Sequence, residues 1–260
     1  MAVLNVTPDS FSDGGRYADP AAAIARAREL AAAGADILDL GGESTRPGSE
    51  AVAPEEQWRR LEPVVRALAA PDGPTLSIDT RDAQVADWGL TAGAHIVNDV
   101  SALGDPAMTA VVARHRAGLV LMHMQGVPGT MQQKPSYEDV VREVAAFLGE
   151  RSDRAIAAGV PREAIALDPG IGFGKAIEHN MQLVARLDEL ARLGFPVVIG
   201  ASRKSFIGRM TGAEVHDRLP GSIAMASIAI FQGARIVRAH DVAETLQAVR
   251  IAEAVRSARR

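Results

Sequence analysis

The sequence predicts a single (β/α)₈ (TIM) barrel domain spanning residues 1–260. The chain has 260 residues and is 47% hydrophobic, which suffices for one barrel core. Eight short apolar runs alternate with longer alanine-rich stretches, and no linker or composition break divides them. The alternative is an open doubly wound sheet. That fold usually has fewer strands and a glycine-rich phosphate turn after the first, and neither GxGxxG nor GxxxxGKS follows the first run here.

The eight apolar runs have the character of parallel strands. Most are apolar throughout rather than alternating, as expected for strands that are covered on both faces. The predicted strands are 3–6, 36–40, 75–79, 95–98, 119–122, 165–168, 197–200 and 235–238.

The first helices between these strands carry clear start and stop signals. Asp19 and Pro20 supply an N-cap and a first-turn proline before a helix over 21–33, and Gly34 follows as a stop. Pro-Glu-Glu at 54–56 opens the next helix and places carboxylates at its positive end.

Two later helices complete the pattern. The last is predicted from near Asp241 to about Arg256. The helix over 219–232 (LPGSIAMASIAIFQ) is uncharged all round, which implies burial on more than one face. A subunit interface and burial under neighbouring helices explain this pattern equally well.

Composition excludes several classes of protein. A formal net charge of −4 argues against general nucleic-acid binding, which usually needs a basic face. The absence of cysteine removes disulfides, thiolate metal sites and cysteine nucleophiles. The first six residues have the pattern of a strand rather than a signal peptide, and no apolar run approaches the roughly 20 residues of a membrane span. We expect a cytoplasmic protein without membrane or nucleic-acid partners.

Polar side chains stand at or just after nearly every predicted strand end. Singly, each could be a cap on the following helix. In a (β/α)₈ barrel, however, these ends converge on one mouth where catalysis takes place. Acidic and amide groups suit a donor-rich heterocycle, and cations after strands seven and eight suit phosphate. The residues are Asn5, Asp39, Glu43, Asp79, Asn98, His123, Asp168, Ser202, Arg203, Lys204, Arg238 and His240.

Short motifs around these positions occur in a fixed order along essentially the whole chain. They are NVTPDSFSDGG from Asn5, GGESTRPG from Gly41, SIDT from Ser77, NDVS from Asn98, MHMQG from Met122, DPGIGFGK from Asp168, SRKS from Ser202 and RAHD from Arg238. Each motif is weak alone, but the ordered set resembles the dihydropteroate synthases.

The resemblance implies a transferase of folate biosynthesis. It would join 6-hydroxymethyl-7,8-dihydropterin diphosphate to 4-aminobenzoate, giving 7,8-dihydropteroate and diphosphate, with Mg²⁺ as cofactor and a homodimer as the assembly. A displacement of S_N1 type is favoured, and one of S_N2 type stays open. Two rivals are a pterin-dependent methyltransferase, which would need no anion-binding loops, and a non-catalytic relative, which would be expected to lack a motif.

The resemblance also assigns site residues. Those of the pterin diphosphate are Thr45, Asp79, Asn98, Met122, Asp168, Phe173, Lys204, Arg238, Ala239 and His240. Of these, the catalytic residues are Asp79, Asp168, Lys204, Arg238 and His240. The 4-aminobenzoate residues are Pro8, Phe11, Thr45, Arg46, Pro47 and Ser205, and the Mg²⁺ ligand is Asn5.

Some assignments have plain structural alternatives. Asn5 could cap a turn, Ser205 could be a helix N-cap, and Met122 and Phe173 could be ordinary core residues. Ala239 is expected to face the ligand through its backbone, which would make its side chain chemically neutral.

Overall fold

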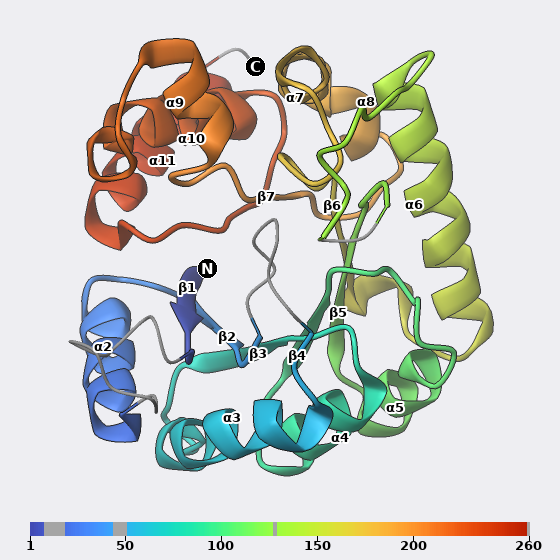
Figure 1. The fold of residues 1–260 in the computed structure, drawn as a ribbon, viewed down its shortest axis with the longest axis vertical. Coiled ribbons are helices and arrows are strands. Elements are labelled where there is room, and N and C mark those ends of the chain that lie inside the picture. Colours follow the sequence, from blue (N-terminus) through green and yellow to red (C-terminus); the bar gives the residue numbers. More distant parts are fainter. Residues whose placement is uncertain (8–18, 44–50, 127–128, 259–260) are drawn as a thin grey trace.

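The computed structural model describes residues 1–7, 19–43, 51–126 and 129–258 and shows the expected parallel barrel with helices outside it (Figure 1). Strands β1 to β6 form one sheet in chain order, and β7 pairs with β8. A bridge between Leu167 and Val197 joins β6 to β7, and a bridge between Ala2 and Ala239 joins β8 to β1. The ring is therefore closed, and the predicted fold class is confirmed.

All eight predicted strands occur, with ends shifted by at most one residue. They are β1 (Ala2–Asn5), β2 (Ile37–Gly41), β3 (Thr75–Asp79), β4 (Ile96–Asp99), β5 (Gly118–Met122), β6 (Ile165–Asp168), β7 (Val198–Ile199) and β8 (Ile236–Val237).

The helices lie outside the strands in the expected alternation. They are α2 (Pro20–Ala32), α3 (Pro54–Leu68), α4 (Ala83–Thr91), α5 (Met108–His115), α6 (Val140–Ala157), α7 (Ile177–Ala185), α8 (Leu187–Ala191), α9 (Ser205–Thr211), α10 (Leu219–Phe231) and α11 (Val242–Ser257), with short 3₁₀ turns η1 (Arg162–Ala164) and η2 (Val215–Asp217).

The start and stop signals act as the sequence indicates. The Asp19 carboxylate accepts a hydrogen bond from Ala21 N (2.9 Å) at the start of α2, a contact that typically stabilises a helix by about 1 kcal/mol. Gly34 follows α2 with φ of 101°, in the left-handed region that a side chain disfavours. Pro54 is the first residue of α3, as predicted.

The barrel interior is mostly apolar in its lower half. Successive side chains of a strand point to opposite faces, so every second residue faces inward. Ser77, in register with Ile96, is a buried polar residue at this level. Five inward apolar residues, three buried and two partly buried, form a cluster of their own, separate from the larger core between sheet and helices. We call this cluster the lower layer; it consists of Ile96, Val120, Ala166, Val198 and Ile236.

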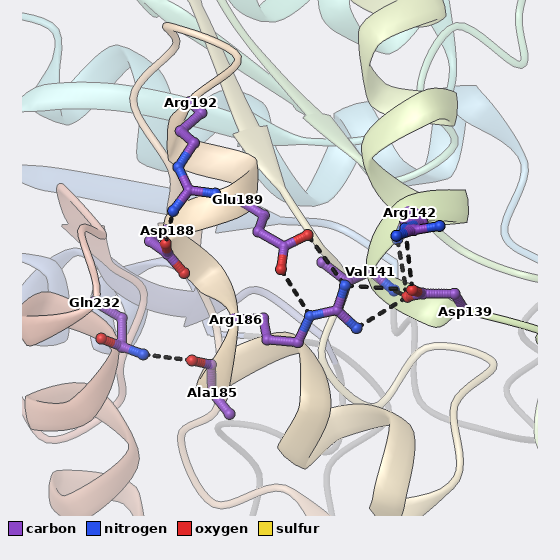
Figure 2. A network of polar contacts seen from close by, with 9 residues as sticks. All are labelled: Asp139, Val141, Arg142, Ala185, Arg186, Asp188, Glu189, Arg192 and Gln232. Carbon is purple, nitrogen blue, oxygen red and sulfur yellow. Dashed lines mark hydrogen bonds and ion pairs between the residues drawn. The ribbon is translucent and has the colours of Figure 1, made fainter.

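A polar network ties helices α6, α7, α8 and α10 together at the outer surface (Figure 2). Arg186, between α7 and α8, donates to Asp139 (3.1 Å) and to Glu189 (2.7 Å). Asp139 is also the N-cap of α6 and accepts from Val141 N (3.1 Å). Gln232, at the end of α10, donates to the Ala185 carbonyl. The charged side chains of this network are about one-third exposed, so solvent screens their ion pairs and each contributes little to stability.

Helix α10 is buried on one side only. It packs against α11, beside which it lies in Figure 1, and Met225, Ala229 and Ile230 are buried. Ile228 on its other side is 48% exposed. Burial under a neighbouring helix therefore explains part of the uncharged sequence but not all of it. Among the described helices, none is long and apolar enough to cross a membrane.

Candidate active site

The strand ends form one row of inward side chains at the barrel mouth. Asn5 is in register with Gly41, Gly41 with Asp79, and Asp79 with Asn98, so these positions line up across β1 to β4. On the other side of the mouth, Asp168 is in register with Met122. Residues in register on parallel strands share a face, so these side chains converge as the sequence predicts.

Arg238 links the two sides of the mouth. Its Nε donates to Asp39 Oδ2 and its Nη2 donates to Asp79 Oδ2, both at 2.6 Å. Asn98 Nδ2 donates to the same Asp39 oxygen at 3.0 Å. The guanidinium is thereby held in one orientation by two buried carboxylates. We call Asp39, Asp79, Asn98, Asp168 and Arg238 the upper layer.

Burial dominates the electrostatics of the upper layer. Removal from water raises the pKa of Asp79 to about 7, although Arg238 opposes the shift. The pKa of Arg238 is raised above its ordinary value because Asp39 and Asp79 outweigh the effect of its burial. Asp79 Oδ1 and Asn98 Oδ1 are buried and accept no hydrogen bond from the described residues. Asp39 Oδ1 is buried in the same way, so the upper layer holds three buried acceptors without partners among the described residues.

Asp168 lies opposite, at the end of β6. Its Oδ1 accepts from Gly170 N at 2.7 Å. Burial raises the pKa of Asp168, while Lys204 and Arg238 lower it. A Cβ on Gly200 would lie 3.9 Å from Asp168 Oδ2 and 3.8 Å from Arg238 Cβ. The glycine therefore leaves open the space between the acid and the guanidinium.

Lys204 faces Asp168 from the loop after β7. Its Nζ donates to the Ile171 carbonyl and lies 4.4 Å from the centre of the Phe173 ring. Burial lowers the pKa of Lys204 to about 8, with Asp168 opposing the shift. Phe173 is half-buried and Met122 is buried. Lys204 and Phe173 thus line the mouth together.

His240 and Ala239 follow β8. His240 is half-buried, with its Nδ1 3.0 Å from Ser202 Oγ and its N–H donating to the same oxygen at 3.2 Å. Ala239 N donates to Met1 O and Ala239 O accepts from Val3 N, each at 3.0 Å. These bonds close the barrel and use the Ala239 N–H, and the expectation that its backbone faces the substrate stays a prediction.

The loop after β7 holds two further predicted residues. Arg203 pairs with Asp241: its Nε donates to Oδ2 at 2.9 Å and its Nη2 to the other oxygen, and its role as a cation for phosphate stays a prediction. Ser205 is not an N-cap, because Lys204 holds that position and Ser205 is the first residue of α9. Ser205 is exposed, and its Oγ accepts from Arg209 at 3.4 Å.

Part of the expected site falls outside the described residues. This applies to Pro8, Phe11, Thr45, Arg46 and Pro47. These are the 4-aminobenzoate residues apart from Ser205, and one of them, Thr45, also belongs to the pterin-diphosphate set.

Sequence reasoning left Asp39 out of the site. Although Asp39 was noted at a strand end, it received no role, yet it is fully buried and bonds both Arg238 and Asn98. The available signal was an isolated carboxylate inside the apolar strand 37–41, two residues before the inward Gly41. A buried charge of this kind needs a partner, and here Arg238 is that partner.

Comparisons with known proteins agree with this geometry. The family model described as "Pterin binding enzyme" matches residues 1–240. A dihydropteroate synthase of Neisseria meningitidis serogroup B is 49% identical, covering 98% of this chain and 92% of that protein. The chain belongs to the dihydropteroate synthase family of pterin-binding enzymes.

Solved structures of this family superpose closely. A Yersinia pestis dihydropteroate synthase in a sulfonamide complex has a TM-score of 0.93 and 44% identity, covering 99% of this chain and 93% of that one. The Xanthomonas albilineans enzyme in complex with 7,8-dihydropteroate has a TM-score of 0.88 and 43% identity, with the same coverage. The family fold extends through the whole barrel.

Proposed function

We propose that this protein condenses 6-hydroxymethyl-7,8-dihydropterin diphosphate with 4-aminobenzoate and releases diphosphate. The observation that carries the proposal is the upper layer, where buried acceptors on Asp79 and Asn98 lack partners among the described residues. Lys204 and Arg238 add cations that interact with Asp79. A relative crystallised with 7,8-dihydropteroate supports the same product.

The pterin would bind through its donor-rich edge. Asp168, Asp79 and Asn98 present acceptors to amino and ring N–H groups, and Lys204 presents a donor to a ring oxygen or nitrogen. Charge-assisted hydrogen bonds in a dry pocket each contribute roughly 1.5–3 kcal/mol. Phe173 and Met122 would contact the flat face of the ring. Because the upper layer is already assembled, little reorganisation accompanies binding.

The diphosphate would lie nearer the rim. Arg238 and His240 follow β8, where a barrel commonly binds phosphate. Arg46 and Thr45 would complete this anion site, and Arg46 with Ser205, Pro8, Phe11 and Pro47 would receive the aminobenzoate.

The site suits Mg²⁺ only in company with substrate. Asn5 places an amide oxygen at the mouth, and the described residues contain no cluster of three His, Asp or Glu side chains that could hold a metal. Mg²⁺ readily combines one protein oxygen with phosphate oxygens and waters, so Asn5 is a sufficient protein ligand. When bound, the ion would neutralise charge on the leaving diphosphate.

The residues favour a dissociative path. The methylene C–O bond breaks as diphosphate leaves, and the aminobenzoate nitrogen forms the C–N bond and then loses a proton to water. The arylamine is already neutral at pH 7, so a base is not needed to activate it. Asp168 and Asp79 would stabilise positive charge spread over the pterin, an effect worth several kcal/mol in a preorganised site. His240 hydrogen-bonds the leaving group and transfers no proton.

A turnover assay tests the proposal. Purified protein is mixed with the pterin diphosphate, Mg²⁺ and labelled 4-aminobenzoate, and labelled dihydropteroate is separated by chromatography. We expect product and diphosphate in equal amounts. The Asp168→Asn variant, purified in parallel, controls for host enzyme. Absence of product from the wild type, or equal product from both proteins, would refute the proposal.

We also propose that the protein acts in the cytoplasm as a homodimer joined through α10 and α11. Ile251 and Val255 on α11 are 68% and 52% exposed, and with Ile228 they border an apolar groove of about 670 Å³. Exposed apolar patches of this kind commonly mark interfaces. In analytical ultracentrifugation, Ile251→Glu should convert dimer to monomer, while Ala254→Glu, exposed on the same helix outside the groove, should not. A monomeric wild type would contradict the proposal.

A further inference from the structure

Lys175 is a buried cation behind the site. It lies in the turn after β6 (residues 169–176) and is only 3% exposed. Its Nζ is 2.9 Å from His123 Nδ1, 2.9 Å from the Phe173 carbonyl and 3.3 Å from the His123 carbonyl. Lysine is almost never fully buried unless it is paired. Here its three partners come from two different loops.

Two of the three partners of Lys175 are carbonyl oxygens, which can only accept, and the third is a ring nitrogen that accepts in one of the two neutral tautomers of His123. An ammonium group has three donors and no acceptor, so the arrangement favours the charged lysine. It requires a neutral His123 whose Nδ1 carries the lone pair and whose Nε2 carries the proton. Burial lowers the pKa of His123 to about 3, so the ring is neutral at pH 7. Burial lowers the pKa of Lys175 to about 7, and Asp168 opposes that shift.

These contacts fasten the turn after β6 to the turn after β5 (residues 123–126). The two turns are already in close contact: His123 N donates to the Asp168 carbonyl at 3.0 Å. A Cβ on Gly170 would lie 1.9 Å from the His123 carbonyl oxygen, so only glycine fits there. Phe173, whose carbonyl Lys175 binds, presents its ring to Lys204. Lys175 thus fixes the segment that carries part of the pterin pocket.

Lys175 also acts on Asp168 through its charge. The charged groups facing Asp168 are Lys204 from the loop after β7, Arg238 after β8, Asp79 at the end of β3, and Lys175 from behind. His123, the remaining titratable neighbour of Lys175, is neutral. The three cations oppose the effect of burial on the Asp168 carboxyl.

We propose that Lys175 is a positioning residue, which locks the turn after β6 onto β5 and helps to keep the Asp168 carboxylate ionised. The inference rests on the proposed function, because the pterin is the ligand that Asp168 receives. Lys175 does not touch the substrate; it acts through Asp168 and Phe173.

The test replaces Lys175 with methionine, which keeps the length of the side chain and removes the charge. We expect the KM for pterin diphosphate to rise at least about tenfold, while the KM for 4-aminobenzoate changes less than about twofold. In carboxyl-¹³C spectra, with Asp168 assigned through Asp168→Asn, the titration midpoint of Asp168 should rise by about one pH unit, since a neighbouring cation is lost.

Tyr137→Phe is the matched control. It removes a 2.8 Å hydrogen bond from Tyr137 to the Gly174 carbonyl, which loosens the same turn without changing its charge. This variant should leave the Asp168 midpoint where it is in the wild type. Equal shifts in both variants, or none in Lys175→Met, would overturn the proposal.

A measurement on the wild type covers the case in which Lys175→Met does not fold. Long-range ¹H–¹⁵N spectra of His123 between pH 6 and 8 should show an unprotonated Nδ1 and a protonated Nε2. A proton on Nδ1 would overturn the proposal. A wild type without turnover would refute the proposed function alone, because the His123 tautomer and the Asp168 midpoint are measured without substrate.

Discussion

The upper and lower layers of the barrel interior have the same backbone and opposite chemistry. Asn98 and Asp168 each stand two residues after a lower-layer residue, Ile96 and Ala166, on the same strands and the same face. The lower layer is wholly apolar, whereas the upper layer contains three carboxylates, an amide and a guanidinium. A step of two residues along a strand therefore leads from an apolar packing residue to a polar residue of the candidate site.

The difference between the layers indicates which part of the barrel interior stabilises the fold. Burying apolar surface stabilises the fold, while burying charged groups costs desolvation that their pairing offsets only in part. The upper layer keeps unpartnered acceptors that an apolar core would not tolerate. Substitutions in the lower layer should therefore reduce stability, and substitutions in the upper layer and its neighbours should reduce activity.

The largest expected effect is on activity at the mouth. Lys204→Ala removes the cation that faces Asp168 and should lower kcat/KM at least about tenfold, since each 1.36 kcal/mol is a factor of ten. The melting temperature should change little, because removing the buried charge also removes the free-energy cost of keeping that charge out of water. Lys134→Ala, at an exposed lysine, is the control. Wild-type steady-state kinetics in Lys204→Ala would contradict the account.

A substitution in the lower layer should have the opposite result, a loss of stability with activity retained. Val198→Ala deletes two buried methyl groups and should lower the free energy of unfolding by about 2 kcal/mol, through lost burial and the cavity left behind. Activity per folded molecule should stay within about twofold. Urea titration with parallel kinetics measures both quantities; a large loss of kcat at full folding would remove the distinction between the layers.

A smaller effect concerns stability against pH. The pKa of Asp79 rises from an ordinary 3.8 to about 7 in the folded protein, so the folded state retains a proton that the unfolded state has lost. Stability is then lost as pH increases from about 4 to 7. Asp79→Asn should show a smaller decline of the melting temperature over this range, with Asp39 still pairing Arg238. Parallel declines in both proteins would contradict the raised pKa.

The smallest effect is the alkaline limb of the activity profile. Because burial lowers the pKa of Lys204 to about 8, this lysine loses its charge just above physiological pH. In the ligand-free enzyme, kcat/KM for the pterin diphosphate should therefore fall above about pH 8. Lys204→Arg stays charged and should lack this limb, whatever its absolute rate. If kcat/KM declines with the same midpoint in the wild type and in Lys204→Arg, the decline must come from the titration of another group.

The strands and the convergence at the mouth were predictable from the sequence because local signals determine them. Apolar runs identify the strands, and barrel geometry then brings Asp79, Asn98 and Asp168 together whatever the loops do. Pairing between distant residues was not predictable. Arg238 binds Asp39, 199 positions away, and Arg203 binds Asp241, 38 positions away. Lys175 likewise gave no sequence signal beyond its motif.

Pterin binding at the upper layer is tested most directly by calorimetric titration of 6-hydroxymethylpterin, without 4-aminobenzoate, into wild type and Asp168→Asn. The expected result is at least about tenfold weaker binding by the variant, from the loss of one charge-assisted hydrogen bond, at an equal or higher melting temperature. Equal affinity in the two proteins would contradict the assignment of this layer to the pterin.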